Sequence, residues 1–501
     1  MKKRIRNIHE FMQNPIKIQT SVLKILIQKG KNTKFGHEHN FNTITNYTSF
    51  KKKIPVRSYE DLEPYIKKIR EGENNVLWPG KVNWFAKSSG TSNSKSKFIP
   101  ITKESLNRCH LKAGKDMLSL YENNFPKKNI YNGKGLMLGG SMAKKKYQKF
   151  NDGDLSAILL DQFPFWVSHH RVPDIKTALM HDWNKKIDAI ANQALNKNIT
   201  NITGVPSWML ILLKRIVKLS GKKNLSQVWP NLELYMHGGI NFEPYRKQFE
   251  KLIANKNMNY LEGYNASEGF IAIQDENPSR GLLLMLNYGV FYEFIPMQKY
   301  RQGKYDAIGL EEVKLNTNYA LVITTNSGLW RYLIGDVIQF TTLFPFRIKI
   351  TGRTKSYINT FGEELMIHNT DTAVSKSCEK HNCSIIDYSV APLYIDKKSG
   401  GHQWFIEFSK KPSNFDLFMK EIDIQIKKTN SDYEAKRQNN LILKFPELII
   451  INKNEFYLWH EENKKLGGQS KIPRLSDNRE FADSILAIVK KFSTKSDTNP
   501  K

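Results

Sequence analysis

The sequence predicts an α/β fold with a large N-terminal domain and a small C-terminal α+β domain. Strand-like runs first alternate with helical stretches, and consecutive strand-like runs then follow between Leu282 and Ile350. A separate mixed pattern begins after Gly352-Arg353. With 501 residues the chain also exceeds what one hydrophobic core usually organises. We therefore assign residues 1–354 to an N-terminal domain and residues 355–501 to a C-terminal domain.

The first part of the chain reads as helices followed by a sheet with crossover helices. The run IQTSVLKILIQK has apolar residues at helical spacing and ends before Gly30. The strand-like runs WFAK, GLMLGG, ELYMHGG and MNYLEG then alternate with helical stretches at residues 175–195 and 207–219. This rhythm is typical of an α/β domain.

The rest of the chain adds an antiparallel block and a second core. Four strand-like runs without helices between them predict an antiparallel sheet or small barrel: residues 282–295, 319–325, 337–342 and 347–351. The C-terminal elements are then expected to be a helix at 366–381, a hairpin of 385–395 with 404–409, a helix at 415–428, a strand at 447–452 and a helix at 479–492.

The composition of the chain argues against nucleic-acid binding and membrane association. The formal net charge is +29, but the lysines are spread along the chain and no recognition signature accompanies them, so we expect no nucleic-acid partner. No apolar run is long enough to cross a bilayer, and membrane association is not expected. Three cysteines in so long a chain indicate a reducing compartment, and we expect a cytoplasmic protein.

A loop rich in hydroxyl groups follows the strand-like Trp84-Phe85-Ala86. Its sequence, SSGTSNSKSKFIPIT, places Ser88, Ser89, Gly90 and Thr91 before a series of lysines. Backbone N–H groups, hydroxyls and ammonium groups can all bind the same phosphate oxygens. The loop is therefore a candidate phosphate-binding loop, and a solvated surface loop is the alternative.

Two further candidate segments follow strand-like runs. Gly238 and Gly239, in HGGI, either let a planar ligand approach the backbone or form a tight turn between strand and helix. Glu268, in YNASEG, either binds Mg²⁺ shared with nucleotide phosphates or is a surface residue or helix cap.

Three more segments complete the series. Asp336, in RYLIGD between expected strands, either accepts hydrogen bonds from ribose hydroxyls or occupies a hairpin turn. The segment TGRTK, with Arg353, and the segment GGQSKIPR, with Lys471 and Arg474, place cations next to glycines. Taken singly, each of these two is a loop with exposed charge.

In this order, five of these segments resemble the auxin-responsive promoter protein family, the acyl acid amido synthetases: SSGTSNSKSKFIPIT, YNASEG, RYLIGD, GRTK and GGQSKIPR. That family lies within the adenylate-forming superfamily, together with acyl-CoA synthetases and luciferases. LWPGKVNWFAKSSGTS and LGGQSKIPRLSDNREF extend the similarity over nearly the full chain. The second motif reads Asn265-Ala266-Ser267 where plant members carry glycine and serines, so we expect a bacterial-type member and transfer no hormone preference.

The resemblance implies an adenylate-forming fold whose C-terminal domain is a mobile lid. It also implies an enzyme that uses ATP and Mg²⁺ to convert a carboxylic acid to an acyl-adenylate and pyrophosphate. The acyl group then passes to an amine, commonly an amino acid, giving an amide and AMP. The expected partners are these small molecules; the acid, the amine and the oligomeric state stay open, and a monomer is compatible with the sequence.

The resemblance also implies roles for individual residues. The implied nucleotide site consists of Ser88, Ser89, Gly90 and Thr91 around the phosphates, Gly238 and Gly239 along the adenine, Tyr264 beside the base and Asp336 on the ribose hydroxyls. Glu268 is the implied Mg²⁺ ligand, and Arg353 contacts ribose or phosphate. Lys471 is the implied lid lysine, which reaches the α-phosphate or the activated carboxylate.

The acyl pocket is expected between the phosphate loop and the strands that lead to Gly239 and Glu268. Its candidate lining residues are Trp208, Met209, Ile240 and Phe270, and ordinary core packing is the alternative for each. Two other functions stay open: a synthetase that uses the same adenylate but forms a thioester with coenzyme A, and a nucleotide- or acid-binding protein without turnover.

Overall fold

The chain forms two compact units in a computed structural model. The described residues are 1–88, 97–126, 130–143, 150–354, 357–358, 363, 365–395, 400–437, 443–463 and 472–496. The first unit comprises Met1–Ile240 and Ala254–Ile350, and the second comprises Asn241–Ile253 and Thr351–Lys501. The second unit therefore includes a segment from the middle of the chain as well as the C-terminal residues.

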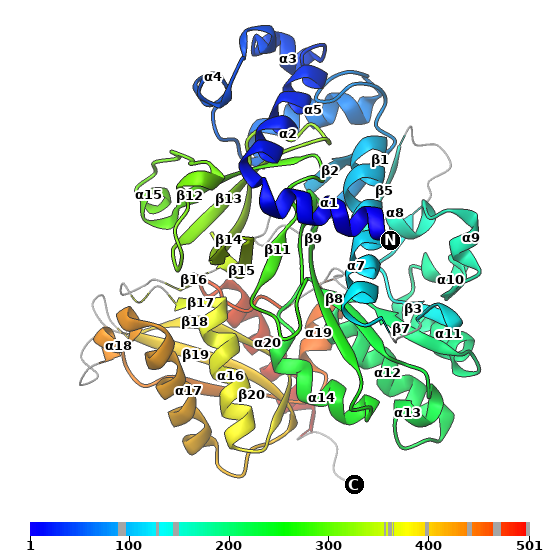
Figure 1. Ribbon diagram of the computed structural model, residues 1–501. Coiled ribbons are helices and arrows are strands. Elements are labelled where there is room, and N and C mark those ends of the chain that lie inside the picture. Colours follow the sequence, from blue (N-terminus) through cyan, green and yellow to red (C-terminus); the bar gives the residue numbers. More distant parts are fainter. Residues whose placement is uncertain are drawn as a thin grey trace. The chain divides into compact units, whose positions relative to one another are not determined.

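The first unit begins with helices whose ends follow from the sequence. They are α1 (Lys2–Gln13), α2 (Pro15–Gly30), α3 (Lys34–Glu38), η1 (Phe41–Thr43), α4 (Tyr47–Lys53) and α5 (Tyr59–Glu71), blue in Figure 1. Helix α5 begins with a reciprocal capping box between Ser58 and Asp61 and ends at Gly72, whose φ of 103° favours glycine. The helices expected in the first fifty residues are thus present.

A four-stranded sheet in the first unit frames the expected phosphate-binding segment. Its strand order is β2-β1-β5-β4. The strands are β1 (Trp84–Ser88), β2 (Lys97–Ile101), β4 (Met142–Ala143) and β5 (Asn151–Gly153). Because β1 and β2 pair antiparallel with Ser88 opposite Lys97, the residues on either side of segment 89–96 are held together.

The main sheet of the first unit has 11 strands in the order β12-β13-β14-β15-β11-β10-β9-β8-β7-β3-β6. Its mutually parallel strands are β3 (Lys134–Met137), β6 (Arg171–Val172), β7 (Ile199–Thr203), β8 (Leu234–Gly238) and β9 (Asn259–Ala266). The strands that follow are β10 (Gly269–Ile273), β11 (Leu282–Leu284), β12 (Val290–Pro296), β13 (Asn318–Thr325), β14 (Tyr332–Leu343) and β15 (Phe346–Arg353). Antiparallel pairing of β10 with β9 joins the two expected blocks into one sheet.

Helices connect the strands of the first unit. They are α6 (Lys103–Ser105), the π-helical turn η2 (Leu106–His110), α7 (Leu111–Asn124), η3 (Ile130–Asn132), α8 (Leu155–Asp161), α9 (Phe165–Ser168), α10 (Ile175–Ala178), α11 (Trp183–Leu195), α12 (Pro206–Ser220), α13 (Leu225–Val228), α15 (Met297–Arg301) and η4 (Leu310–Glu312). The expectation of one helix over residues 175–195 is wrong. The Asp182 carboxylate accepts a hydrogen bond from the Lys185 N–H, which starts a new helix at Trp183.

The second unit has a three-stranded sheet in the order β18-β19-β20. Its strands are β18 (Ser384–Tyr394), β19 (Gly400–Lys410) and β20 (Glu447–Ile451), with a separate pair β16 (Tyr357–Ile358) and β17 (Leu365–Met366). Its helices are α14 (Glu243–Ile253), α16 (Ile367–Lys380), α17 (Phe415–Thr429), α18 (Ser431–Arg437), α19 (Glu455–Glu462) and α20 (Glu480–Ser496). The expected α+β elements of the C-terminal region are therefore present.

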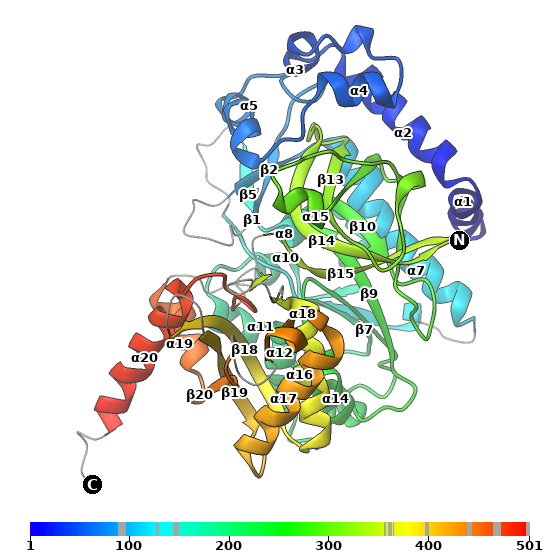
Figure 2. The same ribbon diagram turned by 90° about the vertical axis from the view of Figure 1, so that its left-hand side faces the viewer.

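Alternation along β19 gives this sheet two buried faces. Trp404, Ile406 and Phe408 belong to the core that includes α16 and α17. Phe405, which points to the opposite face, belongs to the core that includes α19 and α20. Figure 2 shows the two helix pairs on opposite sides of the sheet.

Across the part of the chain that the structure describes, none of the helices combines the length and apolar character needed to cross a membrane.

A buried ion pair fixes the start of β14. The guanidinium of Arg331 donates to both carboxylate oxygens of Glu293 on β12, at 2.8 and 2.9 Å, and both side chains are almost completely buried. Tyr47 on α4 also donates a hydrogen bond to Glu293 (2.9 Å), and Arg331 donates to the carbonyl of Ile54 (2.5 Å). One charged pair thus joins two strands and the N-terminal helices.

We expect Arg331→Met to destabilise the protein by about 3–5 kcal/mol, because the carboxylate of Glu293 would remain buried without its counter-ion. The double variant with Glu293→Gln should recover part of that loss, since no unpaired charge remains. Urea unfolding of the native, single and double variants measures both effects. A double variant no more stable than Arg331→Met would contradict this account.

A second buried carboxyl, Glu407 on β19, has no cationic partner among the residues that the structure describes. Its side chain accepts a hydrogen bond from the N–H of Asn454 (2.8 Å), and the residue is only 2% exposed. Burial is the largest cause that raises the pKa of Glu407 to about 7, and the nearby Asp387 and Glu455 raise it further. The folded protein therefore binds this proton more tightly than the unfolded chain.

This raised pKa predicts a loss of stability with rising pH. The contribution of Glu407 is most favourable below the ordinary carboxyl pKa of 4.5 and decreases as pH rises through about 7, by about 3 kcal/mol in total. Glu407→Gln keeps the carbonyl acceptor without the charge, so we expect a higher Tm than native at pH 8.5 and an equal Tm at pH 5. The exposed Glu447→Gln is the matched control. Equal effects of the two substitutions at pH 8.5 would refute the assignment.

Candidate functional site

The two glycines at the end of β8 have different structural roles. Gly238 pairs with Gly263 of β9, and a Cβ on Gly238 would lie 2.1 Å from the carbonyl oxygen of Gly263. Gly239 has a φ of 83°, which begins the turn after the strand, and Ile240 follows it partly exposed. The tight turn that was one of the two interpretations of HGGI is present, and contact of these glycines with adenine stays a prediction.

The motif YNASEG forms the tip of a hairpin. Tyr264 ends the buried part of β9, and Ala266 pairs with Gly269 of β10, so Ser267 and Glu268 form the connection. Glu268 is 7% exposed. The alternative of an exposed surface glutamate is therefore wrong, because Glu268 itself is buried although Asn265 in the same motif is exposed.

Asp336 lies within β14 and not in a hairpin turn between strands. Val322 pairs with Leu333 but Ala320 pairs with Val337, so β14 carries extra residues relative to β13. Gly335, with a φ of 91°, lies in this bulge immediately before Asp336. A bulge redirects the side chain that follows it, and only glycine adopts this backbone conformation without strain.

The bulge brings two motifs together. The hydroxyl of Tyr264 on β9 donates a hydrogen bond to the carboxylate of Asp336 on β14. The two residues are 72 positions apart, and their strands are not neighbours in the sheet. The residue expected beside the base and the residue expected on the ribose are thus in direct contact, and their binding of a nucleoside stays a prediction.

The π-helical turn η2 contacts the hairpin that carries Glu268 and holds it in place. The N–H of Phe270 donates to Sγ of Cys109 (3.1 Å), and the Phe270 ring lies against Gly263, where a Cβ would be 3.0 Å from its Cζ. Burial raises the pKa of Cys109 to about 12, so the thiol stays protonated. No role was expected for this cysteine, and the structure shows that it holds the hairpin through Phe270.

The other candidate acyl-pocket residues lie in a helical interface. The Trp208 ring on α12 meets the Trp183 ring on α11 edge to face, with centroids 4.5 Å apart. Met209 is completely buried. These contacts support the packing alternative for both residues, and their contact with substrate stays a prediction.

The remaining candidate residues lie at the end of β1, in the second unit or outside the described residues. Ser88 is the last residue of β1, whereas Ser89, Gly90, Thr91 and Lys471 lie outside the described residues. Arg353 ends β15 and belongs to the second unit. Their roles stay predictions from the resemblance.

The Arg474 side chain is only 12% exposed within the second unit, and the expectation of an exposed loop cation is wrong for it. Its guanidinium pairs with Asp387, donates to the carbonyl of Tyr388 (3.0 Å) and donates to the hydroxyl of Tyr245 on α14 (2.6 Å). Asp371 lies 4.0 Å away. Arg474 therefore fixes the segment that follows Lys471, and the carboxylates of Asp371 and Asp387, not glycines, determine its position.

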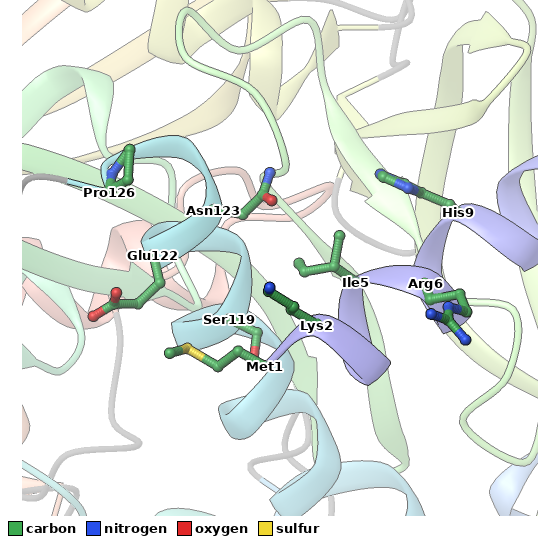
Figure 3. Close-up of a pocket in the computed structure, with 9 residues that line it drawn as sticks. All are labelled: Met1, Lys2, Ile5, Arg6, His9, Ser119, Glu122, Asn123 and Pro126. Atoms are coloured by element: carbon green, nitrogen blue, oxygen red, sulfur yellow. The ribbon is translucent and has the colours of Figure 1, made fainter.

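A shallow hollow of about 580 Å³ lies between α1 and α7 (Figure 3). Its lining residues are Met1, Lys2, Ile5, Arg6, His9, Ser119, Glu122, Asn123 and Pro126. None of the residues expected to bind substrate contributes to it, so we assign it no role.

The chain matches three consecutive domain models of one family. These are the GH3 family N-terminal domain over residues 4–258, the GH3 family central domain over residues 283–353 and the GH3 family C-terminal domain over residues 368–480. They follow the order of the motifs described above.

Characterised relatives carry names of amide-forming enzymes. Indole-3-acetic acid-amido synthetase GH3.4 from Arabidopsis thaliana is 25% identical over 68% of this chain and 67% of its own length. Jasmonoyl–L-amino acid synthetase JAR6 from Nicotiana attenuata is 25% identical over 67% of this chain and 68% of its own length.

Solved structures confirm the expected fold class. GH3.15 acyl acid amido synthetase superposes with a TM-score of 0.78 at 18% identity, covering 97% of this chain and 96% of that chain. A 2-hydroxyisobutyryl-CoA ligase with its acyl-adenylate superposes with a TM-score of 0.53 at 9% identity, covering 99% and 93%. The chain thus has the adenylate-forming fold, and since the first family model alone spans more than half of its residues, it belongs to the GH3 family.

Proposed function

We propose that the protein is an ATP-dependent acyl acid amido synthetase. It converts a carboxylic acid to an acyl-adenylate with release of pyrophosphate, and transfers the acyl group to an amine, for which an amino acid is the leading candidate. The observation that carries the proposal is the hydrogen bond between Tyr264 and Asp336 beside the hairpin of Glu268, which brings together motifs far apart in the sequence. Family membership and the names of the relatives agree with this enzyme class.

Each residue has a physical reason for its proposed role. Attack of a carboxylate on the α-phosphate brings two anions together, so the site must neutralise charge and hold the reactants in line. Asp336 offers carboxylate oxygens to the ribose hydroxyls, and Tyr264 orients that carboxylate. Ser88, Ser89 and Thr91 are proposed to hold the phosphates.

Glu268 fits a Mg²⁺ ion shared with ATP. Among the described ranges no group of three or more His, Cys, Asp or Glu side chains is arranged to hold a metal. Mg²⁺ in nucleotide sites takes one or two carboxylates and completes its shell with phosphate oxygens and water. A single carboxylate on a hairpin tip is therefore a suitable donor, and the ion would supply positive charge next to the phosphates.

The C-terminal residues 355–501 are proposed to act as a mobile lid. Arg353 would contact ribose or phosphate at the boundary, and Lys471 would stabilise the adenylation step and then withdraw so that an amine can enter. The buried cluster around Arg474 supports this role, because it gives the segment after Lys471 a fixed attachment. We also propose a cytoplasmic location, which the scarcity of cysteine supports.

A second candidate function is a ligase that passes the same adenylate to coenzyme A. The fold similarity to 2-hydroxyisobutyryl-CoA ligase motivates it. Both functions share the first half-reaction, and only the acceptor separates them. An acyl thioester formed with coenzyme A, without an amide from any amino acid, would favour this second function.

Adenylation can be tested by ATP–pyrophosphate exchange with Mg²⁺ across aromatic, indolic and aliphatic carboxylic acids. We expect acid-dependent exchange in the native protein and a loss of roughly 100-fold or more in Glu268→Gln, because the metal loses its protein carboxylate. Glu10→Gln, an exposed change on α1, is the control and should leave exchange unchanged. Near-native exchange in Glu268→Gln would remove the metal assignment. ATP binding without exchange for any acid would favour a binding protein.

Tyr264→Phe tests the nucleoside site. Removing the hydroxyl leaves Asp336 without its donor from β9, so we expect the KM for ATP to rise roughly tenfold or more. Tyr65→Phe is a matched control, since it removes a tyrosine hydrogen bond to Glu38 at an exposed position. Steady-state exchange at varied ATP measures both variants. The assignment is contradicted if the two substitutions change the KM for ATP equally.

A further inference from the structure

A buried histidine behind the Glu268 hairpin has one ring nitrogen that the fold leaves unused. His110 is the last residue of the π-helical turn η2, and it is 3% exposed. Its Nε2 is buried and has no hydrogen-bond partner in the described structure. Buried polar atoms without partners are uncommon in folded proteins, and each one needs an explanation.

The other ring nitrogen determines the protonation state. Nδ1 of His110 lies 3.2 Å from the side-chain oxygen of Asn265, which can only accept a hydrogen bond. The proton therefore resides on Nδ1. Burial lowers the pKa of His110 to about 4, so the ring is neutral at pH 7 and Nε2 presents a lone pair.

The backbone at His110 forms a π-helical turn, which is uncommon in proteins. A π-helical turn adds a residue to a helix and often occurs at functional sites. In this turn, two consecutive side chains form hydrogen bonds with the same hairpin. The sulfur of Cys109 accepts a hydrogen bond from the N–H of Phe270, and Nδ1 of His110 donates one to the side-chain oxygen of Asn265. Asn265 lies between Tyr264 and Glu268 in the same motif. The unused acceptor therefore belongs to the layer of the first unit that directly supports the proposed site.

We propose that Nε2 of His110 accepts a hydrogen bond from a donor group on the acyl acid, either a hydroxyl or a ring N–H. This inference rests on the proposed function and names its substrate class, namely carboxylic acids that carry a hydrogen-bond donor in the acyl part. Such a site rejects an analogue without the donor, because the buried acceptor is then left unpaired. His110 is in this account a specificity-determining residue and not a base.

Matched pairs of acids test the proposal. The probes are 2-, 3- and 4-hydroxybenzoate against benzoate, and indole-3-acetate against its N-methyl derivative, each assayed by ATP–pyrophosphate exchange. We expect the native protein to favour the donor-bearing member of at least one pair by tenfold or more in kcat/KM. His110→Phe, which removes the acceptor but keeps a ring, should bring that ratio to within threefold of one. His110→Gln, which restores a carbonyl acceptor, should recover part of the preference.

Other outcomes of this assay would overturn the proposal. A purely structural role predicts that His110→Phe reduces exchange equally for both members of a pair and leaves the ratio unchanged. A native protein that exchanges with acids but discriminates within no pair removes the inference while leaving the proposed function intact. A native protein without exchange for any acid removes both.

A measurement on the native protein avoids any folding defect of the variants. Histidine labelled with ¹⁵N reports the hydrogen bonding of each ring nitrogen by NMR, and the His110→Gln spectrum assigns its signals. We expect the Nε2 signal to shift when ATP and the preferred acid are added, and not with ATP and its donor-free partner. An Nε2 signal already hydrogen-bonded in the free protein and unchanged by either acid would indicate a buried water and overturn the proposal.

Discussion

The ion pair between Arg331 and Glu293 is the constraint on which the first unit most depends. Arg331 has a φ of 46°, a conformation that non-glycine residues rarely adopt, and it is held there by its hydrogen bonds to both carboxylate oxygens of Glu293 and to the carbonyl of Ile54. The pair is buried, so neither charge can exchange its partner for water without large cost. It sets where β14 begins, and thereby the position of every residue farther along that strand.

The candidate site is a consequence of that placement. β14 leaves Arg331, reaches the bulge at Gly335 and then presents Asp336 to the hydroxyl of Tyr264. A regular strand would direct alternate side chains to fixed faces, and the bulge changes that alternation at one position. The hairpin of Glu268 is fixed separately, through the sulfur of Cys109 and the ring of His110. Two independently anchored elements therefore meet at one proposed nucleoside site.

The second unit is built around a sheet that is covered on both faces. Trp404 and Phe405 are directed into separate cores. Arg474 pairs with Asp387 and lies near Asp371, whereas Glu407 has no basic partner within the described part of this unit and has a pKa raised by burial. Burial also raises the pKa of both aspartates, although Arg474 opposes that shift. Stability of this unit is thus more sensitive to pH than that of a purely apolar core.

The sequence by itself determined the order of elements, the family and the identity of the motifs. Hydrophobic periodicity and turn residues are local signals, and the spacing of motifs along a chain is visible without coordinates. Only the tertiary structure decided that Asp336 follows a bulge, that Glu268 is buried on a hairpin tip, that Arg474 is internal and that His110 lies behind Asn265. The physical reason is that strand register, burial and hydrogen-bond pairing depend on contacts between residues far apart in the chain, and a single sequence does not record those contacts.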